Sequence, residues 1–246
     1  MSIQELTPRV SRTYLKFQLV LVFFFASLFG VHAERSVTLL GFTNTLWKYN
    51  DSGIELGSVW RMPAFDDSSW LAGNALLGVE STPALYPFPF LTPLALGPTN
   101  NVTTNFYFRT HFTLEASNLS PGTRLMTTNY VDDGCVIYLN GVEAGRLRVP
   151  LNQNAATYAS FSVLSNGTFP EGTPEPLELS SSALQVGDNV LAVEVHQAGA
   201  DSSDVAWAMN LTALIPVLGD IVSQPQSQQI EILHPFTLCV QILGGP

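Results

Sequence analysis

The sequence predicts an all-β fold, a sandwich built from short antiparallel strands. Apolar residues recur with period two in a series of short segments, which is the spacing of a strand with one buried face. Several of these segments are rich in β-branched and aromatic residues, and Gly, Pro, Asn and Asp separate them. No window of about fifteen residues combines helical apolar spacing with helix caps. Many short strands joined by turns favour a β-sandwich.

The expected strands follow the chain in order. They are 36–42, 105–114, 124–131, 135–141, 158–164, 189–197 and 205–215. The segment 81–105 contains five prolines and is expected to be a long irregular loop. Long loops in compact domains are often functional or cover a sheet edge. A second irregular spacer is expected at 170–176.

Residues 1–33 have the features of a secretory signal peptide. Three basic residues, Arg9, Arg12 and Lys16, precede an uncharged apolar run at 17–30, and small residues occupy the −3 and −1 positions before a cut after Ala33. The run is shorter than the roughly 20 residues needed to cross a bilayer. We therefore expect a secreted protein with no membrane span after cleavage, and an uncleaved N-terminal anchor is the alternative.

The composition limits what the domain can bind. Removing 1–33 takes away three of 10 basic and one of 20 acidic side chains, which leaves 7 against 19. Such an acidic surface repels phosphate backbones, so nucleic-acid binding is not expected. The two cysteines, Cys135 and Cys239, are too few for a disulfide scaffold. We expect residues 34–216 to form one domain with a sizeable core.

Residues 217–246 differ from the rest of the chain. A proline hinge leads into a Ser- and Gln-rich stretch and then into one alternating strand, after which the sequence stops. A single strand does not stabilise itself. We therefore expect a linker followed by the first strand of a truncated domain.

Four segments in this order resemble a galactose-binding-like jelly-roll domain of large secreted bacterial proteins. They are WRMPAFDDSSWLAGNALLGVE (60–80), TNFYFRTHF (104–112), DDGCVIYLNGVEAGR (132–146) and LQVGDNVLAVEVHQAGADSSDVAWAMNL (184–211). The resemblance implies a module that accompanies catalytic or adhesive domains. From 219 onward the tail resembles the start of an immunoglobulin-like module. Alternate residues of a strand point to opposite faces, so if Phe236, Leu238 and Val240 face the core, Cys239 faces away from it. The usual intersheet disulfide is therefore not expected.

The stretch YVDDGCVIYLNG places two carboxylates at the entrance to a hairpin. Asn140-Gly141 suits a two-residue type I′ turn, and Gly134 frees the backbone after Asp132 and Asp133. The two aspartates either cap the hairpin or contribute to a calcium or sugar site. Calcium takes six to eight oxygen ligands, so other loops would have to supply the remainder.

The segment FDDSSW offers Trp70 as a candidate ligand contact. Phe65 and Trp70 are expected to bury large apolar surfaces, and Asp66 and Asp67 to accept backbone N–H groups in a tight turn. The alternative is that these carboxylates bind a metal or a sugar.

Glu194 and His196 share one face of the strand at 189–197, opposite Leu191, Val193 and Val195. They could form an acid–base pair or a buried hydrogen-bonded pair. The sequence contains no familiar catalytic or phosphate-binding motif. An enzyme is therefore not expected within this chain.

These observations predict a non-catalytic, secreted, carbohydrate-binding or accessory module of a larger extracellular protein. Its partners would be carbohydrate or neighbouring modules of the same chain. The alternatives are a structural spacer or adhesion module, and the accessory part of a secreted hydrolase with its catalytic domain beyond residue 246. The candidate ligand contacts are Trp70, Asp132, Asp133, Glu194 and His196, and structural calcium is expected, if anywhere, at Asp132 and Asp133.

Overall fold

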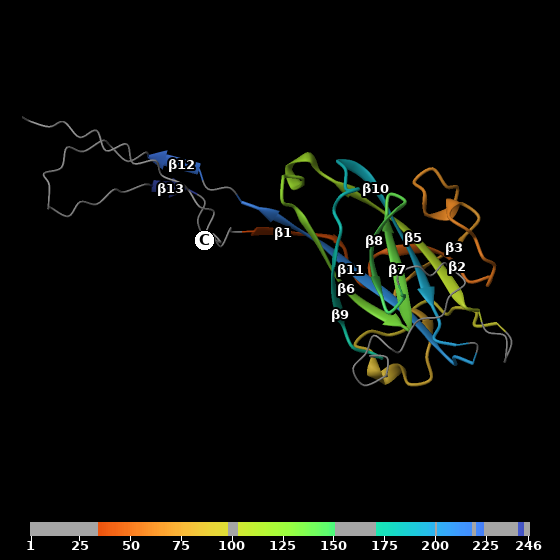
Figure 1. Cartoon of the computed structure of the whole chain (residues 1–246). Helices are drawn as coiled ribbons and strands as arrows, with labels where there is room; N and C mark the ends of the chain where they lie inside the picture. The colour runs from red at the N-terminus through yellow and green to blue at the C-terminus, as the bar shows by residue number, and fades with distance from the viewer. Residues whose placement is uncertain are drawn as a thin grey trace, which may run out of the picture. The chain divides into compact units, whose positions relative to one another are not determined.

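A computed structural model describes residues 34–97, 103–150, 171–199 and 201–217, together with two short strands at 220–223 and 241–243. The expected signal peptide (1–33), the strand expected at 158–164 and Cys239 lie outside the described residues. Two antiparallel sheets pack against each other, so the predicted all-β sandwich is confirmed (Figure 1). Within the described part, no helix has the length and apolar character needed to cross a membrane.

The larger sheet has six strands in the order β3, β2, β5, β10, β7, β8. Their bounds are β2 Leu46–Asn50, β3 Leu71–Asn74, β5 Asn105–Leu114, β7 Gly134–Leu139, β8 Val142–Leu147 and β10 Gly187–His196. β5 and β10 pair along their whole lengths at its centre. The predicted turn joins β7 to β8, with positive φ at both Asn140 (50°) and Gly141 (85°), as type I′ geometry requires.

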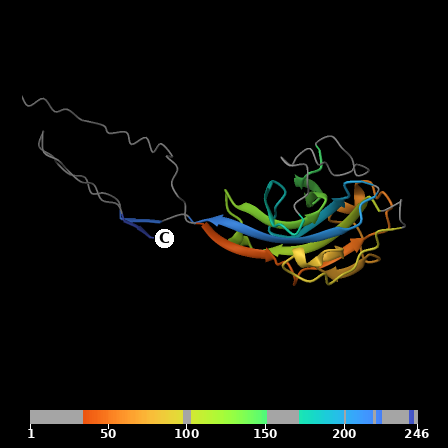
Figure 2. The same ribbon diagram turned by 90° about the horizontal axis from the view of Figure 1, so that it is seen from below.

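The second sheet is organised around the long strand β11. Its members are β1 Glu34–Leu40, β4 Leu77–Val79, β6 Arg124–Asp132, β9 Glu175–Leu179 and β11 Val205–Pro216. β6 pairs with β11 on one side, while β4 and then β1 pair with it on the other. Figure 2 shows β1 running beside β11. β9 pairs with the far side of β6 and is the outermost of the described strands on that side of the sheet.

The remaining elements are short. Among the described residues, three 3-10 helices occupy loops of the sandwich, η1 Val59–Arg61, η2 Pro83–Leu85 and η3 Ala116–Asn118. Near the C-terminus, β12 Asp220–Ser223 and β13 Gln241–Leu243 form an antiparallel pair of their own. The immunoglobulin-like assignment of this region remains a prediction.

The main core lies between the two sheets. Leu191, Val193 and Val195 point into it from β10, as their spacing predicts. Trp47 from one sheet meets Trp207 from the other edge to face, with ring centroids 5.7 Å apart. Burying side chains of this size stabilises a sandwich by roughly 2–3 kcal/mol each, so the contact between the sheets contributes substantially to its stability.

A second apolar cluster covers the outer face of the six-stranded sheet. The loop between β2 and β3 folds back over Tyr107 and Tyr138 and brings Trp60 and Trp70 onto them. Arg109, which is fully buried on this face, donates from Nε to Asp67 Oδ2 at 2.7 Å and from Nη1 to backbone carbonyls of the loop. The sheet is therefore buried on both faces at its centre.

The structure shows where two of the expected irregular segments end. The spacer predicted at 170–176 already contains the first residues of β9, because an edge strand tolerates a proline such as Pro176. The loop predicted at 81–105 ends where β5 begins at Asn105, and within it η2 and a bridge from Thr92 to Leu77 give local order. Residues 98–102 of that loop lie outside the described part.

Candidate functional site

The register of three strands brings carboxylates from distant parts of the sequence to one end of the second sheet. Val205 of β11 pairs with Val79 of β4, so Asp204 and Glu80, the next residues outward, lie opposite each other. On the other side of β11, Ala206 pairs with Asp132 at the end of β6. Because alternate residues of a strand share a face, all three carboxylates project from the same side of the sheet.

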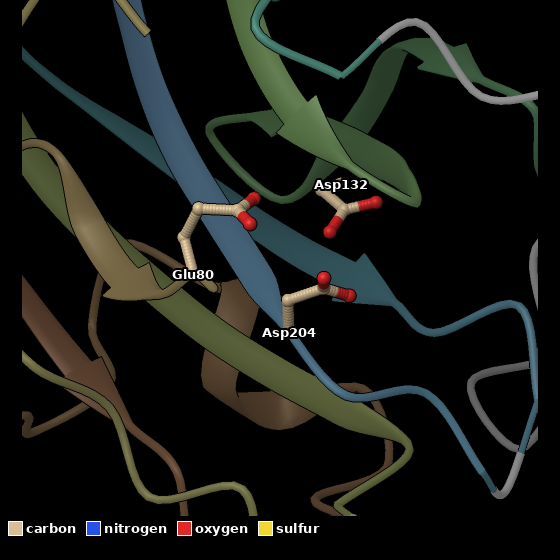
Figure 3. Close-up of side chains that lie close together, drawn as sticks. All are labelled: Glu80, Asp132 and Asp204. Atoms are coloured by element: carbon tan, nitrogen blue, oxygen red, sulfur yellow. The ribbon is translucent and has the colours of Figure 1, made fainter. Parts of the chain in front are cut away.

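We call Glu80, Asp132 and Asp204 the acidic site. One carboxylate oxygen from each residue lies within 4.8 Å of the corresponding oxygens of the other two. Figure 3 shows the three carboxylates pointing toward one another from the ends of their strands. Asp132 is only 2% exposed, whereas Glu80 and Asp204 are half-buried. Solvent therefore reaches the acidic site from the side of Glu80 and Asp204 and not from the side of Asp132.

A glycine allows β4 to approach β11 closely enough to form this arrangement. A Cβ on Gly78 would lie 2.0 Å from the carbonyl oxygen of Val205, and its φ of 156° is one that other residues rarely adopt. Gly78 therefore sets the position from which Glu80 reaches Asp204.

The oxygens of the acidic site differ in their partners. Glu80 Oε1 accepts the backbone N–H of Thr82 at 2.7 Å and its hydroxyl at 2.9 Å, which orients the carboxylate. The other oxygen, Glu80 Oε2, is buried without a partner among the described residues. The Asp132 carboxyl group has hydrogen-bond contacts only with the neighbouring carboxyl groups of Asp133 and Asp204 among the described side chains, so it depends on a proton where a cation could serve instead.

The electrostatics of the site favour an added positive charge. Burial, followed by the charge of Asp133 and then that of Asp204, raises the pKa of Asp132 to about 9. The pKa of Asp204 is also raised, by burial and by the charge of Glu80. A third nearby carboxyl group, Glu171, has a raised pKa from its own burial and from the charges of Asp204 and Glu80. Without a cation, the site holds a proton at neutral pH.

Asp133 has a different role from Asp132. Its Oδ2 accepts the backbone N–H of Ala198 at 2.5 Å, and its own N–H donates to the carbonyl of His196 at 3.4 Å. This carboxylate therefore anchors the start of the loop that leads from β10 to Asp204. Burial raises the pKa of Asp133, and the Ala198 hydrogen bond opposes that shift. Of the two aspartates singled out by the sequence, Asp132 is the one that belongs to the acidic site.

The donor set fits a hard cation. All three groups offer carboxylate oxygens, which Ca²⁺ prefers, and the three converging oxygens would supply three of its six to eight ligands. Sequence reasoning missed Glu80 and Asp204. Asp204 directly precedes an apolar strand that was predicted, and Glu80 follows a strand that was not, but the register that joins them has no local signature.

Glu194 and His196 lie on the covered outer face of the six-stranded sheet, apart from the three carboxylates. Tyr138 donates its hydroxyl to Glu194 Oε1 at 2.7 Å, and His196 Nε2 is 3.7 Å from the same oxygen. The guanidinium of Arg61 lies over the Tyr138 ring, 4.6 Å from its centroid. The predicted sharing of a face by Glu194 and His196 is confirmed, and both side chains are buried.

Trp70 also lies on the covered outer face. It is 9% exposed and stacks on Trp60, with Phe65 at its edge, as expected for a core tryptophan. Its role as a ligand contact remains a prediction. Asp66 forms the predicted turn by accepting the N–H of Ser68 at 3.0 Å, while Asp67 pairs with Arg109.

The chain matches no family model and no curated protein sequence. Among solved structures it is similar in part to β-glucuronidase 2 of Bacteroides uniformis, with 16% identity over 74% of this chain and 18% of that chain, at a TM-score of 0.45. A β-glycosidase from Bacteroides vulgatus shares 12% identity over 73% of this chain and 20% of that chain, at a TM-score of 0.41. A β-glucuronidase from Ruminococcus gnavus shares 11% identity over 79% of this chain and 31% of that chain, also at a TM-score of 0.41. The chain thus spans 18% to 31% of these proteins' lengths.

Proposed function

We propose that this sandwich is a non-catalytic, calcium-binding accessory module of a larger secreted protein, and that its ligand is carbohydrate. The observation that carries the calcium assignment is the convergence of three carboxylates at one end of the sheet, with Glu80 Oε2 buried and unpartnered among the described residues. A bound cation would replace the proton on Asp132 and give Glu80 Oε2 a partner.

The acidic site would use the ion to fasten three separate parts of the chain. Glu80 begins the loop that leads to β5, Asp132 ends β6, and Asp204 ends the loop before β11. Binding to all three would hold these loops in one arrangement. Ions that bind only the native state stabilise it by mass action, by about 2.7 kcal/mol at one hundred times the dissociation constant.

The carbohydrate assignment rests on the half-buried state of Glu80 and Asp204 and on the resemblance to galactose-binding-like domains. Calcium takes six to eight oxygen ligands, so three carboxylates leave coordination positions open, and fewer remain if a carboxylate binds through both oxygens. Sugar hydroxyls are suitable oxygen ligands for such positions. A spacer that binds calcium but no sugar is the competing function, as is an accessory part of a secreted hydrolase.

The test is a calcium titration of the chelator-treated full chain by calorimetry and thermal unfolding. Asp204→Asn and Glu80→Gln should each weaken calcium binding by at least tenfold. Asp201→Asn, which removes an exposed carboxylate from the same loop, is the matched control and should leave binding unchanged. A glycan panel with and without calcium then decides the ligand: calcium-dependent binding supports the module as proposed, and calcium binding without any glycan favours the spacer. Absence of calcium binding by the wild-type chain would refute the proposal.

A further inference from the structure

Arg148 lies directly behind the Asp132–Asp133 turn and contacts its backbone from two sides. Its Nε donates to the carbonyl of Asp133 at 2.6 Å, and its Nη2 donates to the carbonyl of Val131 at 3.1 Å. Those two carbonyls flank Asp132 along the chain. The planar guanidinium therefore fixes the backbone on both sides of the most buried carboxylate of the acidic site.

The guanidinium is itself held in place. Its Nη1 pairs with Glu175 Oε2 at the start of β9, and the carbonyl of Glu175 accepts from Asn129 Nδ2 at 3.0 Å. Arg148 is 5% exposed, and its φ of 55° lies in the left-handed region that non-glycine residues seldom occupy. Such a conformation persists only where the surrounding contacts determine it, and the contacts described here join Arg148 to the backbone of Val131 and Asp133 and to Glu175 of β9.

We propose that Arg148 is a positioning residue of the acidic site, which acts by holding the backbone of Val131–Asp133 so that the Asp132 carboxylate faces Glu80 and Asp204. This inference rests on the proposed calcium function. Arg148 does not touch the ion. Its planar fork matches two carbonyls at once, which a lysine ammonium on a flexible stem does not reproduce. The fork therefore supplies a geometry at Val131–Asp133 that charge alone would not provide.

The experiment compares Arg148→Lys and Arg148→Gln with the wild-type full chain. Calcium dissociation constants come from calorimetry, and terbium serves as a luminescent probe whose lifetimes in H₂O and D₂O count the waters on the bound ion. Tyr86 is a suitable sensitiser, since it is buried and lies close enough for the charges of Asp132 and Glu80 to raise its pKa. Both variants should bind calcium about 10- to 100-fold more weakly, with at least one additional water on terbium.

The matched control is Arg146→Gln. Arg146 lies two residues earlier, pairs with Glu143 and donates to the carbonyls of Val149 and Pro150, but makes no hydrogen bond to the turn. Its variant should keep calcium affinity within about twofold of wild type. If Arg148→Lys keeps the wild-type affinity and hydration, even with a lower melting temperature, the positioning role is refuted while the calcium site stands. If the wild-type chain binds no calcium, both proposals fail together.

A second variant covers the case in which Arg148→Lys does not fold. Glu175→Gln leaves Arg148 intact and removes only the charge that anchors its guanidinium. We expect a smaller weakening of calcium affinity, about three- to tenfold, with a native circular dichroism spectrum. An affinity equal to that of wild type would overturn the proposal in this case.

Discussion

Asp132→Asn should stabilise the metal-free protein and abolish its stabilisation by calcium, so that one substitution acts in opposite directions under two conditions. Asparagine has nearly the same shape as aspartate and carries no charge. In the metal-free protein it removes the need to hold a proton at a buried position beside Asp133 and Asp204. In calcium it removes the carboxylate that lies deepest in the acidic site.

The magnitude follows from the pKa of Asp132. An unfolded aspartate titrates near 3.8, and the folded value is about 9, so at pH 7.5 the folded protein holds a proton that the unfolded chain releases. Holding it across the roughly 3.7 pH units from 3.8 to 7.5 costs about 5 kcal/mol as an upper limit. Glu80 and Asp204 are half-buried, so solvent screens part of the charge around Asp132 and the cost is smaller than this limit. We therefore expect Asp132→Asn to raise the free energy of unfolding of the metal-free protein by about 2 kcal/mol, which corresponds to a melting temperature roughly 4–8 °C higher.

The assay is thermal or urea unfolding at pH 7.5, in chelator and in excess calcium, for wild type and Asp132→Asn. Wild type should gain about 2.7 kcal/mol at one hundred times its calcium dissociation constant, and the variant should gain almost nothing. Asp201→Asn serves again as the control and should respond as wild type does. If Asp132→Asn destabilises the metal-free protein, or if it keeps the full calcium shift, the reasoning about this carboxylate is wrong.

Three further predictions follow from the same structure. Because the pKa of Asp132 is raised in the folded protein, the stability of the metal-free protein should fall as pH rises from about 4 to 9. Saturating calcium should flatten or reverse this dependence. Unfolding measured at a series of pH values tests both expectations. Asp67→Ala should destabilise the protein by about 3 kcal/mol in urea unfolding, because it leaves the buried guanidinium of Arg109 without its counter-charge. The control is Asp66→Ala at the exposed neighbouring position, which should cause a smaller loss of stability. Gly78→Ala should lower the free energy of unfolding by about 1–3 kcal/mol and weaken calcium binding as well, because the new Cβ would push β4 away from β11. A calcium affinity equal to that of wild type by calorimetry would show that the position of Glu80 does not depend on the close approach of these strands.

The strands that carry a clear period-two pattern could be predicted from the sequence, and the covered faces could not. The alternation of β10 correctly assigns Leu191 and Val193 to the core between the sheets. It leaves open whether Glu194, on the opposite face, is buried, because the covering loop with Trp60 has no periodic pattern of its own. Short strands such as β4 escaped prediction for a related reason, since three residues are too few to establish a period.

The acidic site was predictable only at Asp132. The sequence DDG marks the end of one strand and the start of another, so its carboxylates were visible as candidates. Asp204 and Glu80 join Asp132 through the registers of β4, β11 and β6, and these pairings depend on which strand lies beside which in the folded sheet. A register that connects residues far apart in the sequence is fixed by packing, and no short motif encodes it.

The same comparison explains why the acidic site suggests a ligand rather than a structural accident. Elsewhere among the described residues, the two buried arginines each have a counter-charge: Arg109 has Asp67, and Arg148 has Glu175. At the acidic site the described residues do the opposite, placing carboxylates beside carboxylates and raising their pKa values. Local arrangements that work against folding persist where function requires them. A calcium ion would turn this unfavourable cluster into the point that fastens three loops at one end of the sandwich.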